Sequence, residues 1–260
     1  MNSYGAKEGM AIYSARLLKE FDGKSAIIGI GMPVLATLLA KKLYCPNLSA
    51  SIESGSSDVD IKEIPFSLFG ARLTYGCSAQ LDNLSVLSAA VRGKVEVGFL
   101  GGAQIDCYGN LNSTAIGDYL NTTDRLAGTG GAIDIGCYAK FTITVMAHEK
   151  RRLVEKVDYV TTPGWYVKDW PSGEMVPRQQ VGLPGGPYAV VTNLGIMKFD
   201  QSTKKIYLYN NFPGVSIEKI KENTGFDLDV SRAVEAEPIS EYELTVLRTQ
   251  VDPFNLYGTR

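Results

Sequence analysis

Short apolar segments that end in glycine-containing turns recur along this chain, and they constrain its fold more than any other feature. Residues 25–29, 48–53 and 95–100 are apolar runs of strand length, and each leads directly into such a turn. Residues 34–43 and 84–92 carry helical periodicity. Buried strands that alternate with helices are typical of βαβ units. The sequence therefore predicts an α/β fold with an open, mainly parallel sheet flanked by helices.

Other segments extend this alternation. A helix is expected over residues 10–21, and strands are expected over residues 141–146 and 157–161. Pro33 lies near the first position of the predicted helix 34–43, where its missing N–H costs nothing. At 260 residues, the chain is long enough to bury a core without disulfides or metals.

The last third of the sequence changes character. Residues 167–187 are rich in proline, glycine and charge and show no periodicity, so we expect a long surface loop. Short strand-like runs joined by turns predict an antiparallel meander over residues 188–209. Ser240 and Glu243 form a capping box at the start of a predicted final helix. No segment has the composition of a linker, so we expect one domain over residues 1–260 with a C-terminal antiparallel extension.

Charge and hydropathy argue against several classes of protein. The chain has 26 Lys and Arg against 28 Asp and Glu, so it lacks the basic excess of a general nucleic-acid binder. Its apolar stretches are far shorter than a membrane span, and residues 1–21 lack the apolar core of a signal peptide. These features predict a cytoplasmic protein without nucleic-acid or membrane partners.

The single histidine and the spacing of the cysteines limit the chemistry. His148 is the only histidine, so a multi-histidine metal site within the chain is excluded and any histidine-containing triad has to include it. The cysteines form no C-x-x-C pair, which argues against a zinc ribbon or a redox motif. No metal is expected. We expect all four cysteines to be buried apolar residues of a protein in a reducing compartment: Cys45, Cys77, Cys107 and Cys137.

Ligands of parallel α/β sheets bind beyond the carboxyl ends of the strands, which is where the glycine turns of this chain fall. Gly29 and Gly31 follow the first predicted strand, Gly101 follows another, and a further glycine cluster spans residues 128–131. Glycine lets backbone N–H groups approach a phosphate or an oxyanion closely. The alternative is that these are ordinary turns. Residues 29–33 lack the third glycine of the dinucleotide fingerprint, so a nicotinamide site is not expected.

Glu53 is the residue that most suggests a reactive group. It closes an apolar run and stands directly before Ser54 and Gly55, at the carboxyl end of a predicted strand. A carboxylate at this edge can act as a nucleophile, as a base or as a ligand of a substrate hydroxyl. The alternative is an ordinary strand-end acid that is solvated or paired with a basic residue.

A basic run follows the predicted strand that ends at Met146. Lys150, Arg151 and Arg152 carry adjacent positive charges, which can bind phosphate groups. The alternative is a solvated surface turn or the start of a helix.

The order of several short motifs matches a known family along nearly the whole chain. The sequence resembles the β subunits of family I CoA-transferases, and that of glutaconate CoA-transferase in particular. Each motif is weak alone, but their joint order and spacing are specific. The motifs are Gly29-Ile-Gly-Met-Pro33, Glu53-Ser-Gly55, Gly101-Gly-Ala-Gln-Ile-Asp106, Tyr108-Gly-Asn-Leu-Asn-Ser-Thr114, Gly117-Asp118, Gly128-Thr-Gly-Gly-Ala132, His148-Glu-Lys-Arg-Arg152, Asp158-Tyr-Val-Thr161 and Asn223-Thr-Gly-Phe-Asp-Leu-Asp229.

This resemblance implies a covalent mechanism. The family's catalytic nucleophile is a glutamate before Ser-Gly or Asn-Gly, which corresponds to Glu53 here. Its carboxylate attacks an acyl-CoA thioester, and the enzyme then carries CoA as a glutamyl thioester. The amides of Gly130, Gly131 and Ala132 are the candidates for oxyanion or substrate contacts. The candidates for coenzyme A contacts are Gly29, Gly31, Met32, Lys150 and Arg151.

The resemblance also implies partners and substrates. The family's active site lies between an α and a β subunit, and this chain carries only β-type motifs. A separate CoA-transferase α subunit and a hetero-oligomer are therefore expected. Coenzyme A is expected as a co-substrate, with no permanently bound cofactor. The substrates implied are a short acyl-CoA and a small carboxylic acid, and a dicarboxylic acid such as glutaconate is favoured. The fold implied is that of the CoA-transferase β subunits.

Three alternative functions stay open. Relatives of this subunit act as acyl-CoA hydrolases or as decarboxylases or lyases, which is associated with loss of the nucleophilic glutamate. Related folds bind effectors in sugar-responsive regulators, which predicts ligand binding without turnover. A non-catalytic structural subunit is the third alternative. The presence of Glu53 favours CoA transfer.

Overall fold

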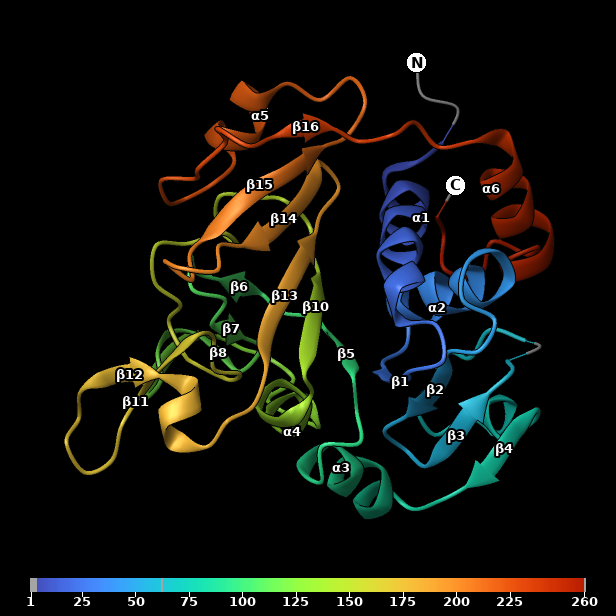
Figure 1. The fold of residues 1–260 in the computed structure, drawn as a ribbon, viewed down its shortest axis with the longest axis horizontal. Helices are drawn as coiled ribbons and strands as arrows, with labels where there is room; N and C mark the ends of the chain where they lie inside the picture. The colour runs from blue at the N-terminus through green and yellow to red at the C-terminus, as the bar shows by residue number, and fades with distance from the viewer. Residues whose placement is uncertain (1–3, 62, 260) are drawn as a thin grey trace. The chain divides into compact units, whose positions relative to one another are not determined.

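The computed structural model describes residues 4–61 and 63–259, and the chain forms two compact units. The first unit contains residues 1–99 and 238–260, and the second contains residues 100–237. Figure 1 shows the elements of each unit in chain order. This division into units does not test the expectation that residues 1–260 form one CoA-transferase-type domain, which stays a prediction.

The first unit is built on three parallel strands, β5 (Val97–Leu100), β1 (Ser25–Ile28) and β2 (Ser49–Ile52), with β1 in the centre. The register pairs Ile28 with Ile52, so β1 and β2 end together. Both isoleucines are almost completely buried. Parallel strands that are covered on both faces are apolar along their length, which explains the continuous apolar run of β1.

Helices pack on these strands. α2 (Met32–Leu43) contacts β1 and α1 (Ala6–Leu17), and every residue from Val34 to Ala40 is buried. A helix that is apolar on all sides has to be buried among other elements. α1 continues into the 3-10 turn η1 (Leu18–Phe21), so the predicted first helix begins at Ala6 rather than at residue 10.

The C-terminal segment also belongs to the first unit. α6 (Glu241–Val246) contacts α1, and the π-helical turn η4 (Leu247–Val251) contacts α2. The predicted capping box is confirmed, because Ser240 N donates to Glu243 Oε2 at 2.8 Å and Glu243 N donates to Ser240 Oγ at 3.2 Å. Arg16 of α1 donates to the same carboxylate at 2.7 Å, which ties the cap to the first helix.

A two-stranded antiparallel ribbon and a helix follow β2. The ribbon consists of β3 (Ser56–Val59) and β4 (Cys77–Gln80), with the 3-10 turn η2 (Ala71–Leu73) between them and α3 (Asn83–Val91) after them. The glycine turn expected after residues 48–53 is short, and β3 begins at Ser56. Ser56 and Ser57 are strand residues, because they pair with Gln80 and Ala79.

The expectation that all four cysteines are buried is wrong for two of them. Cys45 and Cys137 are buried, but Cys77 and Cys107 are partly exposed. Cys77 opens the second strand of the ribbon, and a ribbon of two strands cannot enclose its side chains as a packed sheet does.

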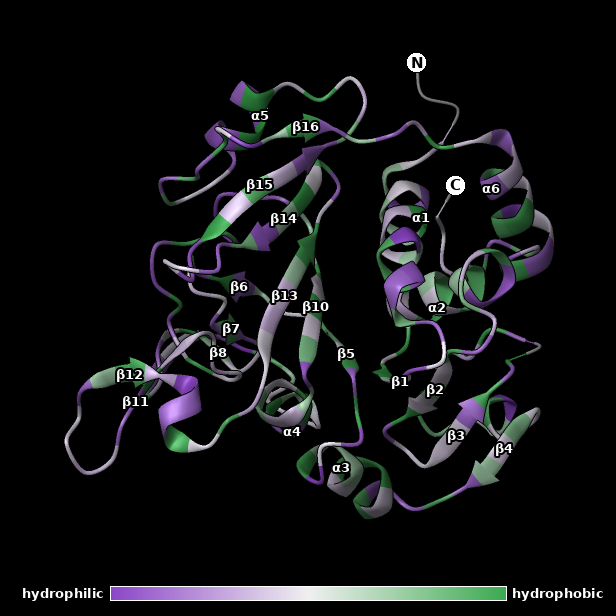
Figure 2. Ribbon diagram, in the orientation of Figure 1, coloured by the Kyte–Doolittle hydropathy of each residue, from purple (hydrophilic) through white to green (hydrophobic). Residues whose placement is uncertain are grey.

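The second unit contains a mixed sheet. β10 (Phe141–Val145) is parallel to β13 (Gly186–Val191), which starts an antiparallel meander with β14 (Gly195–Phe199) and β15 (Ile206–Asn211). β16 (Val234–Glu235) adds a parallel pair with β15. α4 (Ala132–Tyr138) contacts β13, and α5 (Ile217–Glu222) follows the meander. Figure 2 shows the hydrophobic colour along most of β10, as it does along β1.

Shorter elements occupy the connections of the second unit. The 3-10 turn η3 (Arg178–Val181) leads toward β13. Two-stranded antiparallel pairs are β6 (Gln104–Ile105) with β7 (Leu111–Asn112), β8 (Ala115–Asp118) with β9 (Asn121–Arg125), and β11 (Tyr166–Lys168) with β12 (Met175–Pro177).

Two predicted elements of the second unit are wrong. Residues 157–161 form no strand, because their polar groups bond to other segments: Gln104 of β6 and Gly117 of β8 donate to Asp158, and Ser113 N donates to Thr161 Oγ1. Residues 167–187 are not one irregular loop, because β11 and β12 form a hairpin there.

The predicted fold class is confirmed. Parallel strands with packed helices and an antiparallel meander make an α/β fold with a C-terminal antiparallel extension. No helix in the described part of the chain is long and apolar enough to cross a membrane.

Candidate active site

The carboxyl ends of β1 and β2 bring two of the predicted site segments together. Because Ile28 and Ile52 are register partners, Gly29 and Glu53 follow neighbouring positions of adjacent parallel strands. Adjacent strands lie about 4.8 Å apart. The glycine loop after β1 and the Glu53 turn after β2 therefore share one edge of the sheet, which is the edge where α/β proteins bind ligands.

Glu53 lies on a tight turn between β2 and β3 and is partly exposed. Gly55 N donates to Ile52 O at 3.0 Å, which closes the turn. The Asn83 side chain donates from Nδ2 to the backbone carbonyl of Glu53 at 2.7 Å. No residue in the ranges 4–61 and 63–259 donates a hydrogen bond to the Glu53 carboxylate or pairs with it. This carboxylate is therefore available to a ligand and is not paired with any basic residue that the structure describes.

Gly55 is required by the close approach of the next segment. Its φ is +124°, and a Cβ at this position would lie 2.1 Å from the carbonyl oxygen of Leu81. Leu81 N donates to Gly55 O at 2.9 Å. An alanine here would have a strained backbone conformation, and its Cβ would clash with the backbone of Leu81.

The glycine loop after β1 leads into the first turn of α2. Gly31 has φ +85° and precedes Met32, and as a glycine it offers no side chain to cap the helix. Pro33 lies in the first turn, as predicted, where its missing N–H costs nothing. The uncapped N–H groups at the start of α2 are suited to a negatively charged group or a developing oxyanion. Gly29, Gly31 and Met32 thus stand beside Glu53 along the sheet edge, whereas the other predicted site residues belong to the second unit.

The predicted oxyanion residues lie at the start of α4 in the second unit. Gly130 has φ +46°, and Gly131 is the residue before the helix. The N–H of Ala132 donates to Thr129 O at 2.8 Å, so this amide already has an acceptor. Among the described residues, no acceptor is bonded to the N–H groups of Gly130 and Gly131.

The basic run after β10 is partly neutralised by its own glutamate. Arg151 donates to Glu149 at 2.7 Å and Arg152 at 3.3 Å, and both contacts keep the pKa of the Glu149 carboxyl below its usual range. Arg152 also reaches the carbonyl of Gly102. Lys150 is exposed and has no ion-pair partner within the described residues. Lys150 is thus better placed than Arg151 to meet a phosphate.

His148 is structural in this fold. Its side chain is buried, with Nδ1 3.1 Å from Thr192 Oγ1 and Nε2 3.0 Å from Thr224 Oγ1. Burial lowers the pKa of His148 to about 4, because a charged imidazolium loses its solvation there. Both ring nitrogens are occupied and the ring is neutral at pH 7. A general base or triad role for the only histidine is therefore excluded by its surroundings.

We expect acid to destabilise the protein through His148. The unfolded chain takes up a proton near pH 6.5, whereas the buried ring does so near pH 4. The stabilising contribution is therefore complete above pH 6.5 and is lost as the pH falls toward 4, by about 3 kcal/mol. Denaturant unfolding at several pH values in this window measures the slope.

His148→Gln provides the control for this slope. Because the chain has a single histidine, the variant removes the only imidazole that titrates between pH 4 and 6.5. It should be less stable at pH 7 and should show a flatter pH dependence. An unchanged slope in the variant would show that other groups cause the acid sensitivity.

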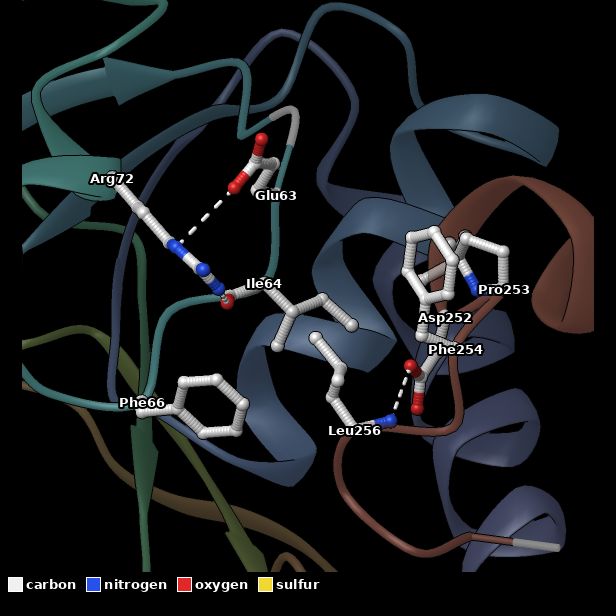
Figure 3. A pocket seen from close by; sticks show the side chains of 9 residues that line it. Glu63, Ile64, Phe66, Arg72, Asp252, Pro253, Phe254 and Leu256 are labelled. Carbon is white, nitrogen blue, oxygen red and sulfur yellow. Dashed lines mark hydrogen bonds and ion pairs between the residues drawn. The ribbon is translucent and has the colours of Figure 1, made fainter.

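A cavity of about 270 Å³ in the first unit contains none of the predicted site residues. Figure 3 shows Ile64 and Phe66 facing Leu256, with the ion pair of Arg72 and Glu63 beside them. The Arg72–Glu63 distance is 3.2 Å, and both side chains are well exposed. The cavity is mainly apolar and lacks a free reactive group, so it does not compete with the Glu53 edge as a catalytic site.

Asn83 is a site residue that sequence reasoning missed. It is the first residue of α3, thirty positions after Glu53, and its amide reaches the Glu53 turn only because β3, β4 and α3 fold back onto that turn. Within residues 4–61 and 63–259, no three His, Cys, Asp or Glu side chains are grouped as metal ligands.

Comparison with known proteins identifies the family. The model of the coenzyme A transferase family matches residues 15–223. This chain belongs to the coenzyme A transferase family. The resemblance inferred from the motifs is therefore confirmed.

Relatives of this coenzyme A transferase chain match over nearly its full length. The B subunit of glutaconate CoA-transferase from Acidaminococcus fermentans is 41% identical over 96% of this chain and 94% of that protein. The B subunit of 3-oxoadipate CoA-transferase from Pseudomonas knackmussii is 33% identical over 95% of this chain and 94% of that protein.

Solved structures agree with the family assignment. The crystal structure of glutaconate coenzyme A-transferase from Acidaminococcus fermentans matches this coenzyme A transferase chain with a TM-score of 0.90 at 39% identity, covering 98% of each chain. The crystal structure of the decarboxylase AibA/AibB matches with a TM-score of 0.80 at 22% identity, again over 98% of each chain. The second likeness shows a shared fold.

Proposed function

We propose that this chain is the β-type subunit of an acyl-CoA:carboxylate CoA-transferase and that Glu53 is its nucleophile. The observation that carries the proposal is the Glu53 carboxylate itself. It lies on a clamped turn at the carboxyl edge of the sheet, and no described residue is bonded to it. A nucleophile has to reach the substrate, and an unpaired carboxylate at this edge can do so.

The proposed reaction has two halves. A carboxylate oxygen of Glu53 bonds to the thioester carbon of the acyl-CoA, and CoA leaves as the thiolate, which gives a mixed anhydride. The thiolate then attacks the glutamyl carbonyl, which releases the acyl group as a free carboxylate and leaves CoA on Glu53 as a thioester. The acceptor acid attacks this thioester and reverses both steps. No net water or redox equivalent is consumed.

Fixed donors have to stabilise the tetrahedral intermediates of these steps. A carboxylate is a weak nucleophile, and each addition creates an oxyanion that needs preorganised N–H groups. We assign oxyanion or substrate contacts to Gly130, Gly131 and Ala132; the first two have unoccupied amides among the described residues. Coenzyme A contacts are assigned to the uncapped loop Gly29, Gly31 and Met32, and to Lys150 and Arg151. Binding of the CoA tail supplies free energy far from the reacting carbonyl.

The substrates are a short acyl-CoA and a small carboxylic acid, and the active complex contains a partner α subunit. The support for a partner is that two relatives are named as the B subunits of glutaconate and 3-oxoadipate CoA-transferases. Both of those names also refer to dicarboxylic acids, which favours a dicarboxylic substrate here. Coenzyme A enters and leaves as a co-substrate, with no permanently bound cofactor.

Trapping of the covalent intermediate tests the proposal. The chain is assembled with its α-type partner, incubated with glutaconyl-CoA and treated with borohydride, which reduces a glutamyl thioester to an alcohol. Peptide mass spectrometry then examines Glu53, with the exposed Glu63 of the same unit as an internal control. We expect reduction at Glu53 that depends on glutaconyl-CoA and spares Glu63.

Other outcomes would replace the proposal. Free CoA that accumulates while Glu53 stays unmodified would indicate an acyl-CoA hydrolase or a decarboxylase or lyase. Binding of acyl-CoA without turnover would indicate a ligand-binding or structural subunit.

A further inference from the structure

The nucleophile assigned above is held only through its backbone. Among the described residues, none bonds to the Glu53 carboxylate, so hydrogen bonds to the side chain do not orient it. Its direction depends on the peptide groups of the turn over residues 52–55. A carboxylate attacking a thioester has to be placed within a few tenths of an ångström, and a displacement of about 1 Å costs about 100-fold in rate.

Three contacts fix this turn. Gly55 N donates to Ile52 O at 3.0 Å, and Leu81 N donates to Gly55 O at 2.9 Å. The third contact is the 2.7 Å hydrogen bond from Asn83 Nδ2 to Glu53 O, and it is the one made to the reactive residue itself. The first two contacts join backbone groups, so of the three only this one depends on a side chain that can be replaced.

Asn83 is itself held in place. It is the first residue of α3, directly after the cap Asp82. Asp82 Oδ1 accepts from Ser85 N at 2.6 Å, and hydrogen bonds from the side chain and the backbone of Ser85 keep the pKa of the Asp82 carboxyl below its usual range. The cap fixes the start of the helix, so Asn83 reaches the turn from a rigid element and not from a loop.

We propose that Asn83 is a positioning residue for CoA transfer: its amide clamps the Glu53 carbonyl and so aims the Glu53 carboxylate at the thioester. The inference rests on the proposed role of Glu53 and adds a residue that acts through it without touching substrate. It predicts that loss of the amide slows formation of the enzyme–CoA thioester and leaves acyl-CoA binding nearly unchanged. Asn83 is exposed, so its replacement removes little buried structure.

The test uses three variants of the chain assembled with its partner subunit. Asn83→Ala removes the clamp, Asn83→Gln keeps an amide donor, and Asn47→Ala is the matched control. Asn47 is also exposed, and its Nδ2 donates to Asp22 at 3.1 Å just before the opposite end of β2. Rapid-quench measurement of thioester formation from glutaconyl-CoA gives the rate, and steady-state kinetics give kcat and KM.

We expect Asn83→Ala to lower the rate of thioester formation and kcat by about 10- to 100-fold, with KM changed less than about twofold. Asn83→Gln should recover most of that rate, and Asn47→Ala should match the wild type. A wild-type rate in Asn83→Ala would overturn the inference. An equal loss in both Asn83 variants together with a lower Tm would also overturn it, because it would mark a merely structural role.

The two proposals fail in different ways. If wild-type enzyme forms no thioester on Glu53, the proposed function fails before any variant is compared. If wild-type enzyme forms the thioester and Asn83→Ala forms it equally fast, only the positioning role fails.

Discussion

Replacing Glu53 by glutamine should lower CoA transfer by about 1,000-fold or more, because an amide is a far weaker nucleophile than a carboxylate. Glutamine has nearly the same shape, and the contacts that fix the turn are made by backbone groups and by Asn83. The loss should therefore appear in kcat with little change in Tm. Steady-state transfer from glutaconyl-CoA to acetate, measured in the assembled complex, provides the rate.

Glu63→Gln is the matched control for this prediction. Glu63 is another exposed acid of the first unit, and its ion pair with Arg72 at 3.2 Å is of the surface kind that contributes little. This variant should transfer CoA at the wild-type rate. A Glu53→Gln enzyme that keeps wild-type transfer would remove Glu53 as the nucleophile and with it the covalent route.

Replacing Arg178 by methionine should destabilise the protein by about 3–5 kcal/mol. Arg178 is completely buried, and its guanidinium donates to four backbone carbonyls at 2.7–3.2 Å: Pro163, Gly164, Gly136 and Cys137. Burial of the charge lowers the pKa of Arg178, but the fixed dipoles of these carbonyls hold the cation. Methionine fills similar space and leaves all four carbonyls without this donor. Denaturant unfolding at pH 7 measures the loss.

Two comparisons make the Arg178 prediction specific. Arg178→Lys keeps the charge but loses the planar guanidinium that reaches several carbonyls at once. Its free energy of unfolding should therefore lie between those of Arg178→Met and the wild type. Arg125→Met removes an exposed arginine of the same unit that lies 4.8 Å above the Tyr119 ring, and it should cost less than about 0.5 kcal/mol. Equal stability of Arg178→Met and Arg125→Met would contradict the structural role of the buried cation.

Local patterns in the sequence were enough to predict much of the fold. The apolar run of β1, the proline at the start of α2 and the Ser240–Glu243 box all act over a few residues. Predictions failed where a strand-like segment found other partners. Residues 157–161 have the composition of a strand, but Asp158 and Thr161 accept hydrogen bonds from Gln104 and Ser113 and the segment pairs with no sheet in the described chain.

The sequence by itself determined the family, the parallel α/β core and the place of Glu53 at a strand end, because these depend on short-range patterns of apolar, glycine and acidic residues. Tertiary structure decided which groups are free and which are held. Burial made His148 neutral and enclosed Arg178 among carbonyls, and the return of α3 brought Asn83 to the Glu53 carbonyl. These contacts join residues up to 76 positions apart, and no local pattern encodes them.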